Sequence, residues 1–198
     1  MSIFEIAKKN DSNAMKAFIT SGGDVNAQNK DDNELASGLT ALMVAALNHC
    51  YDVAKLLVEA GAEVNLQSDD GLTALKAAST EGYLDIMKLL INAHADINAK
   101  EKVNLWTALI SAAGENQLAA VELLIEAGAN VDFKDKWGRT ALIVAAERGF
   151  PTIAKALIDA NADVNVIILP PGITALERAK ANGHSDIASM LKAAGAKR

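Results

Sequence analysis

The stretch DGLTALKAASTEGYLDIMKLLINAHADIN, residues 70–98, recurs in variant form along the chain. Its Thr-Ala-Leu step returns at four other places, so that successive threonines are 33, 34, 33 and 34 residues apart: Thr40, Thr73, Thr107, Thr140 and Thr174. A period in this range is typical of proteins built by stacking one supersecondary unit on the next. The chain is therefore expected to be an array of like units.

The quoted unit reads as two short helices. Thr73 is expected to open the first helix, because a threonine hydroxyl can accept a hydrogen bond from an unpaired amide at a helix start. Ile86, Leu89 and Leu90 recur at helical spacing and predict the second helix. The pair Asp70 and Gly71 marks a tight turn ahead of the threonine. Each unit is thus expected to be a turn, a helix, a second turn and a second helix.

Other residues keep a fixed distance from each threonine. A leucine follows it by two residues and an alanine by five, and the second helix carries two adjacent apolar residues. The unit then closes on a short signature, such as GAEVN at 61–65, whose first residue suits a left-handed helix cap; His94 departs from Gly at this place. We expect the core to include Leu42, Leu75, Leu109, Leu142 and Leu176, with the pairs at 56–57, 89–90, 123–124, 156–157 and 190–191.

These residues resemble the ankyrin repeat, whose pattern is Gly-x-Thr-Pro-Leu-His-x-Ala-Ala, then Gly-His, Leu-Leu and Gly-Ala-Asp-Val-Asn. The resemblance covers nearly all of the chain. Alanine replaces the proline throughout, and the histidine position holds Met43, Lys76, Ile110, Ile143 and Glu177. The hydrogen bond that this histidine makes to the neighbouring unit in the family is therefore in doubt here.

The resemblance implies an all-α fold, an ankyrin-repeat solenoid of stacked helix-turn-helix units with hairpin-like fingers along one edge. It also implies one domain over residues 1–198. In this division residues 1–27 and 168–198 are capping repeats, and residues 28–66, 67–100, 101–133 and 134–167 are internal repeats. In the first repeat the apolar positions predicted to be buried are Ile3, Ile6, Ala7, Met15, Phe18 and Ile19.

The last repeat differs from the others at two positions that should face a following repeat. Lys180 stands where earlier units have Ala46, Ala113 and Ala146, and Lys192 stands where they have Val58, Ile91, Ile125 and Ile158. A terminal repeat needs a polar outer face to stay soluble. These lysines therefore indicate a C-terminal cap, with the solenoid ending at Arg198.

Composition narrows the class of partner. The formal net charge of −6 and pI near 5.1 argue against nucleic acid, which is bound through clustered Lys and Arg. No apolar run approaches the roughly 20 residues of a membrane-spanning helix, and the N-terminus lacks the order of a signal peptide. Cys50 is the single cysteine and cannot form an internal disulfide, which favours a reducing compartment such as the cytoplasm; localisation stays open.

The sequence contains no motif that predicts catalysis, a cofactor or a metal. It has no Gly-rich phosphate loop, His-Glu-x-x-His or Gly-x-Ser-x-Gly. His49, His94 and His184 fall in different units, whereas a closed zinc site needs four converging ligands. Asp69 and Asp70 stand at a finger tip, where nothing predicts a water-excluding pocket that would shift a pKa. We therefore expect a chain that is not an enzyme.

Two fingers depart from the common pattern. The finger before Thr40 carries about six extra residues around Lys30–Ala36, which is interpreted either as a tolerated insertion or as a longer finger that touches a partner. Before Thr107, Leu105 replaces the glycine of the other units, and the turn there is expected to be reshaped.

The predicted function is a protein-interaction module or scaffold that binds a partner protein through its concave face and fingers, and that is a monomer on its own. The alternatives are a permanent structural or regulatory subunit of a larger assembly, or an enzyme or ligand-binding domain, which would need a deep polar pocket. The candidate contact residues lie on the fingers, where they either meet the partner or lock one finger to the next: Leu39, Leu72, Val103, Leu105, Trp106, Trp137, Arg139, Ile168, Leu169 and Ile173.

Overall fold

The computed structural model describes residues 1–30, 37–168 and 172–197. These residues form twelve helices in six pairs, and no strand longer than an isolated bridge. The chain divides into two compact units, residues 1–103 and 104–198. The helices of the first unit are α1 (Ile3–Lys8), α2 (Ser12–Thr20), α3 (Ala41–Leu47), α4 (Tyr51–Glu59), α5 (Ala74–Glu81) and α6 (Leu84–Asn92). Those of the second are α7 (Ala108–Gly114), α8 (Leu118–Glu126), α9 (Ala141–Arg148), α10 (Pro151–Asp159), α11 (Ala175–Ala181) and α12 (Ser185–Ala193).

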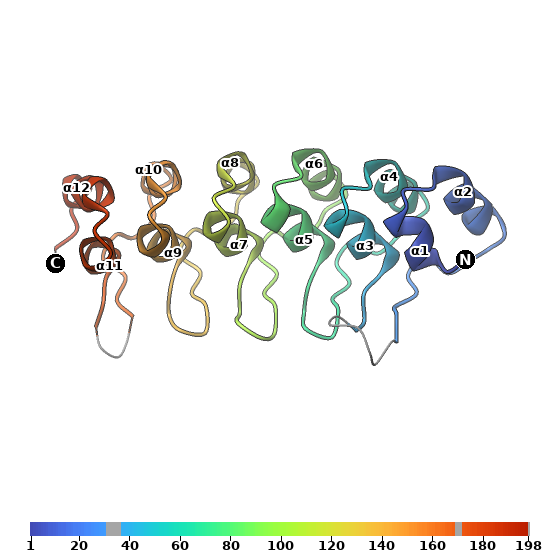
Figure 1. Ribbon diagram of the computed structural model, residues 1–198, viewed down its shortest axis with the longest axis horizontal. Helices are drawn as coiled ribbons and strands as arrows, with labels where there is room; N and C mark the ends of the chain where they lie inside the picture. Colours follow the sequence, from blue (N-terminus) through green and yellow to red (C-terminus); the bar gives the residue numbers. More distant parts are fainter. Residues whose placement is uncertain (31–36, 169–171, 198) are drawn as a thin grey trace. The chain divides into compact units, whose positions relative to one another are not determined.

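Each unit stacks its helix pairs in two rows. In the first unit α1, α3 and α5 pack side by side as one row, and α2, α4 and α6 form the other. The second unit repeats this arrangement with α7, α9 and α11 in one row and α8, α10 and α12 in the other (Figure 1). We call the first row inner, because the fingers extend from its helices, and the second row outer.

The recurring threonines cap the inner helices, as the sequence predicts. Each hydroxyl accepts a hydrogen bond from the amide three residues later, at 3.1–3.4 Å in the five inner helices from α3 to α11. The threonines are themselves buried. A threonine in this place therefore satisfies an amide that water does not reach, for about 1 kcal/mol each.

The predicted leucine columns form the core. The leucine two residues after each threonine is at most 2% exposed, and the second leucine of each outer-helix pair is fully buried. The first member of each pair is half-buried instead. In the first repeat Ile3, Ile6, Ala7 and Met15 are buried.

The expected burial of Phe18 and Ile19 is wrong, because both side chains are half-buried. The Phe18 ring lies over the backbone of Gly23, where a Cβ atom would come within 2.3 Å of it. The ring thus covers the turn after α2 and does not enter the core.

The finger before Thr107 differs from the others in its turn, as the sequence predicts. Within the described residues, the backbone bonds that close the turns at Ser68–Leu72 and Asp135–Arg139 have no counterpart at Leu105, which nevertheless has a left-handed backbone, with φ of 59° against 83° at Gly71 and 81° at Gly138. A leucine in this region costs roughly 1–2 kcal/mol more than glycine. Its neighbour Asn104 accepts a hydrogen bond from the backbone amide of Lys136 in the next finger at 3.0 Å.

Hydrogen bonds link neighbouring repeats at their ends. The last residue of the closing signature accepts a bond from a backbone amide one repeat later: Asn26 from Glu63 at 2.8 Å, Asn65 from Asp96 at 2.7 Å, Asp132 from Asp163 at 2.9 Å and Asn165 from Lys197 at 3.1 Å. The fingers are linked through their backbones, as in the bond from Lys102 to Asp70 at 2.8 Å. Asn or Asp recurs in the signature because a short side-chain oxygen makes this link.

Candidate functional site

The finger at residues 134–139, in the second unit, is organised by the carboxylate of Asp135. One oxygen accepts bonds from the backbone amides of Trp137 at 2.9 Å and Arg139 at 2.8 Å. The other accepts from Nε of Arg139 at 2.9 Å and from the indole nitrogen of Trp106 at 3.2 Å. Asp135 is buried, so its charge is compensated by these four donors and not by water.

Arg139 is held between the two tryptophan rings. Its guanidinium carbon lies 4.7 Å from the ring centre of Trp137 and 5.9 Å from that of Trp106. The same side chain bonds Glu147 of α9 at 3.1 Å. The guanidinium thus bonds two carboxylates and lies near two aromatic rings. These contacts within the chain fix its position.

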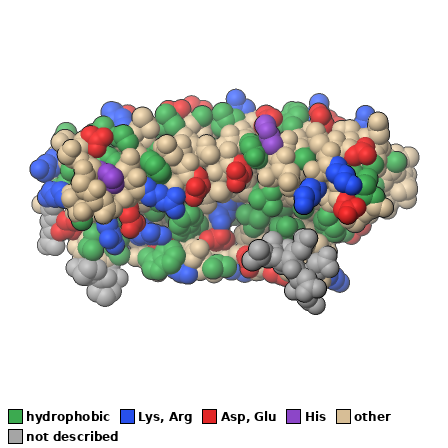
Figure 2. All heavy atoms as spheres, viewed as in Figure 1, with side chains coloured by type: hydrophobic (Ala, Val, Ile, Leu, Met, Phe, Trp, Pro, Cys, Tyr) green, Lys and Arg blue, Asp and Glu red, His purple; other side chains and the backbone are tan. Residues whose placement is uncertain are grey.

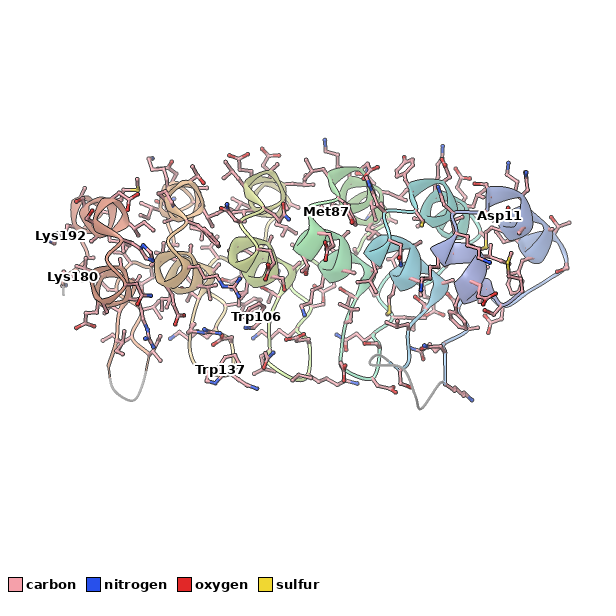
Figure 3. The ribbon with its side chains drawn as sticks, in the orientation of Figure 1. Asp11, Met87, Trp106, Trp137, Lys180 and Lys192 are labelled. Carbon is pink, nitrogen blue, oxygen red and sulfur yellow. The ribbon has the colours of Figure 1, made fainter. Side chains whose placement is uncertain are left out.

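The two tryptophans differ in exposure. Trp106 is half-buried, and a Cβ atom added at Gly114 of α7 would lie 3.7 Å from its ring. Trp137 is 47% exposed and carries Lys136 over its ring at 4.4 Å. Figure 3 shows Trp137 far along its finger and Trp106 closer to the helices. Trp106 therefore connects finger and helix, whereas Trp137 presents a large apolar surface to solvent.

Leu105 extends this exposed surface onto the adjoining finger. It is 40% exposed, and its neighbour Asn104 is bonded to Lys136, which precedes Trp137. Figure 2 shows a hydrophobic patch at the lower edge of this unit with basic side chains beside it. We call the set Leu105, Lys136, Trp137 and Arg139 the finger surface. The sequence predicted three of these residues, and the structure brings them together.

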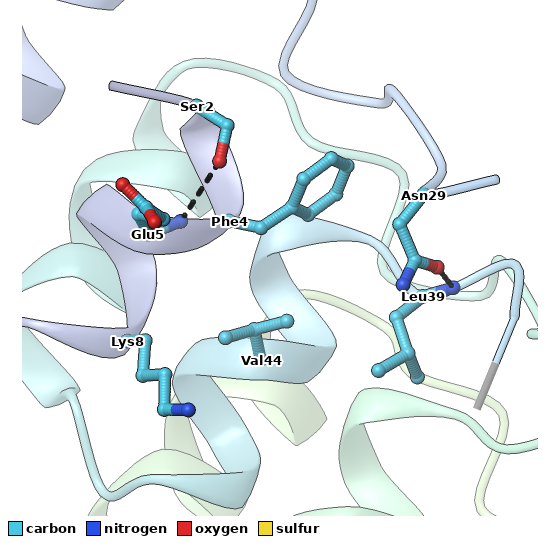
Figure 4. Close-up of a pocket in the computed structure, with 7 residues that line it drawn as sticks. All are labelled: Ser2, Phe4, Glu5, Lys8, Asn29, Leu39 and Val44. Carbon is cyan, nitrogen blue, oxygen red and sulfur yellow. Dashed lines mark hydrogen bonds between the residues drawn. The ribbon is translucent and has the colours of Figure 1, made fainter. Parts of the chain in front are cut away.

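Other predicted residues lie elsewhere. In the first unit Val103 is exposed and Leu72 is half-buried. Leu39 is only 8% exposed, which favours packing over contact with a partner at this residue. Its side chain faces a hollow of about 270 Å³ that Phe4, Val44, Glu5 and Lys8 also line (Figure 4). The amide of Leu39 is bonded to Asn29, which holds the residue at that wall.

The last finger gives a mixed result. Ile168 is only 7% exposed and pairs through its backbone with Ile173. Ile173 is half-buried. Leu169 lies outside the described residues.

Sequence reasoning missed Asp135 and Glu147 as residues that hold the finger surface. Asp135 stands two residues before Trp137 and three before Gly138, the spacing of a turn in which an aspartate bonds nearby amides. That signal was available in the sequence. The contact with Glu147 was not, since it joins the finger to a different element, α9.

The histidines and the cysteine have structural surroundings. His49 stacks on Tyr83 with ring centres 4.1 Å apart and lies 3.0 Å from a carboxylate oxygen of Asp85. The buried thiol of Cys50 donates to the carbonyl of Lys8 at 3.6 Å, and burial raises the pKa of this thiol because the thiolate would lose its water. Within the described ranges, no three His, Cys, Asp or Glu side chains are grouped closely enough to hold a metal ion.

Comparison with known proteins gives the family. A family described as ankyrin repeats in three copies matches residues 3–101, 93–168 and 109–197, which together cover nearly the whole chain. The chain belongs to the ankyrin repeat family. The all-α ankyrin-repeat solenoid expected from the sequence is thereby confirmed, with the stacked helix pairs of both units.

A curated relative is the mitochondrial disaggregase of Homo sapiens, which is 37% identical over 67 residues. The match covers 34% of this ankyrin chain and 9% of the length of that relative. Ankyrin repeats are generally protein-interaction modules, and their fold is typically non-catalytic. Helices in the described segments are nine residues long at most, too short to cross a bilayer.

Proposed function

We propose that this chain is a non-enzymatic protein-binding module whose finger surface contacts a partner protein. The observation that carries the proposal is the exposed ring of Trp137, backed by an arginine that Asp135 and Glu147 hold in place. Tryptophan and arginine are the residue types most often found as hot spots of protein interfaces.

Preorganisation supports this reading. Binding usually loses free energy by ordering side chains, roughly 0.5–1.5 kcal/mol for each flexible one. Arg139 is already ordered by two carboxylates and two rings. The exposed ring of Trp137 lies beside the ammonium group of Lys136, so the surface combines a hydrophobic contact with a cation.

The test uses three versions of the chain. Trp137→Ala removes the exposed ring, and Leu47→Ala is the matched control because Leu47 is also an exposed apolar residue, 37% accessible, at the end of α3. A partner captured from source-cell lysate by the unaltered chain is purified and titrated against each version. Trp137→Ala should weaken binding by about 2–4 kcal/mol, whereas Leu47→Ala should leave it unchanged.

Circular dichroism melts separate binding from folding. Trp137→Ala should melt close to the unaltered chain, because its ring is half in solvent. Trp106→Ala should melt at a lower temperature, because its ring packs on α7 and bonds Asp135. If Trp137→Ala binds the partner normally while folded, the finger surface is not the contact, and the reading in which fingers lock to one another takes its place.

A further inference from the structure

A second surface lies on the outer row of the second unit. Helices α8, α10 and α12 pack side by side there, away from the fingers (Figure 1). The solvent-facing sides of these helices form the walls of an open groove of about 530 Å³. The apolar part of its lining comes from Leu118 of α8, Pro151 and Ala156 of α10, and Met190 of α12, all of them half-buried.

One small residue widens this groove relative to its counterpart between α2 and α4, a hollow of about 330 Å³ that Leu56 lines. Ala156 is the first member of the apolar pair on its outer helix, where the other units have Leu56, Leu89, Leu123 and Met190. A leucine here would stand in the space between α8 and α12. Alanine leaves that space open, and the neighbouring apolar side chains line it without filling it.

The rim of the groove is acidic. Glu122, Asp159 and Asp186 line it and are exposed, while the one lysine in the lining, Lys155, forms an ion pair with Asp159. The lining thus carries three carboxylates against one ammonium group. An apolar floor with such a rim complements a segment that has apolar residues on one side and Lys or Arg beside them.

We propose that this groove docks a basic amphipathic helix of a partner protein. The groove is walled by helices, whose backbone amides and carbonyls are already paired within each helix. An extended peptide would find no sheet edge here to bond its own backbone, whereas a helix pairs its backbone internally. Apolar residues one turn apart on the docked partner helix enter the hollow at Ala156, and the basic residues of that helix meet Glu122 and Asp186.

The site is independent of the finger surface, since the residues of the two do not overlap. The probe is a synthetic fluorescein-labelled helical peptide with Leu along one face and Arg on both flanks. Its binding to the full chain is measured by fluorescence anisotropy at low salt. Ala156→Leu narrows the hollow, and Ala119→Leu adds the same side chain to an exposed position of α8 outside the groove.

The unaltered chain and Ala119→Leu should bind the probe equally, and Ala156→Leu should bind it at least about tenfold more weakly because the apolar contacts are lost. The double variant Glu122→Gln with Asp186→Asn should also weaken binding, and added salt should reduce the difference between it and the unaltered chain. A peptide with Glu in place of each Arg should not bind. Trp137→Ala should bind the probe as the unaltered chain does, which keeps this test separate from that of the finger surface.

Several results would overturn the proposal. The first is that the unaltered chain does not bind the probe. The second is that Ala156→Leu binds the probe as tightly as the unaltered chain does, with an unchanged melt. The third is that the acidic peptide binds the unaltered chain as tightly as the basic probe does. Light scattering tests whether a second copy of the chain occupies the groove instead. If the unaltered chain is a dimer that Ala156→Leu converts to a monomer, the groove is an interface between two copies and not a site for a basic helix.

Discussion

At the scale of single residues, the carboxylate of Asp135 determines the geometry of a whole finger. It accepts four hydrogen bonds, two from backbone amides and two from the side chains of Arg139 and Trp106. All of these groups are donors, so the site requires an acceptor at both oxygens. An amide in place of the carboxylate would turn an NH₂ group toward at least one donor and would leave Arg139 with less compensating charge.

Asp135→Asn should therefore destabilise the chain by about 1.5–3 kcal/mol, the range for hydrogen bonds to charged groups. Urea unfolding followed by tryptophan fluorescence measures this, and the folded-state emission should shift to longer wavelength as the rings gain water. Asp163→Asn is the control, because Asp163 is exposed and its side chain bonds the amide of Asn165 alone. Equal stability of the two variants would show that Asp135 does not hold the finger.

A matched pair of glycines separates backbone strain from close contact. Gly61 and Gly71 both have φ of 83°, but nothing lies within 4 Å of a Cβ atom added at Gly61. At Gly71 the added atom would come within 2.7 Å of the backbone nitrogen of Lys102, which also bonds Asp70. Gly61→Ala should cost about 1 kcal/mol through strain alone. Gly71→Ala should cost clearly more in the same urea melts, and equal costs would mean that the neighbouring finger yields freely.

At the scale of the element, an outer helix has a core side and a side toward solvent. In α6 the adjacent Leu89 and Leu90 lie on these different sides, since Leu90 is fully buried and Leu89 is half-buried. Their neighbours in α4 and α8 behave in the same way. The first member of the pair is thus free to change, and the small Ala156 of α10 leaves a wide groove without disturbing the core.

Leu90→Ala should destabilise the chain by roughly 2–5 kcal/mol, because it leaves a cavity that the surrounding helices cannot close. Leu89→Ala is the matched control on the same helix, and it should cost less because part of its side chain already contacts water. Urea melts of both variants give the comparison. If Leu89→Ala were the more costly of the two, the assignment of the two sides of α6 would be reversed.

At the scale of the whole molecule, stacking exposes a face wherever a helix pair has no neighbour. Within the second unit, α9 and α10 pack against the last pair, and they carry Ala146 and Ile158 at the two positions that the sequence predicts to face it. The last pair carries Lys180 and Lys192 at the equivalent positions, and both are exposed (Figure 3). Charged groups on this face oppose the stacking of another chain, because they would lose their hydration in the contact.

Replacing both lysines with the residues of the α9 and α10 pair, as Lys180→Ala with Lys192→Ile, should therefore make the chain self-associate. Light scattering at increasing concentration measures this. The control is Lys55→Ala with Lys88→Ile, which makes the same change of charge at exposed positions of α4 and α6. A monomeric Lys180 and Lys192 variant would show that these charges do not protect the face.

The repeated sequence by itself determined the helix pairs, the threonine caps and most of the core. These features depend on residues close together in the chain and on a period that shows each of them several times. The sequence also singled out Leu105, Trp137 and Arg139, because large apolar, aromatic and basic residues stand out in a finger.

The tertiary structure alone decided which of the candidate residues meet solvent and what holds them. Leu39 and Ile168 proved buried, and Trp106 proved half-buried against α7, because their exposure depends on elements that lie beside the finger and not on the finger itself. The groove at Ala156 likewise appears only when α8, α10 and α12 are side by side. Local sequence encodes local hydrogen bonds and helix faces, whereas burial and hollows arise from side chains that are a full repeat apart in the chain.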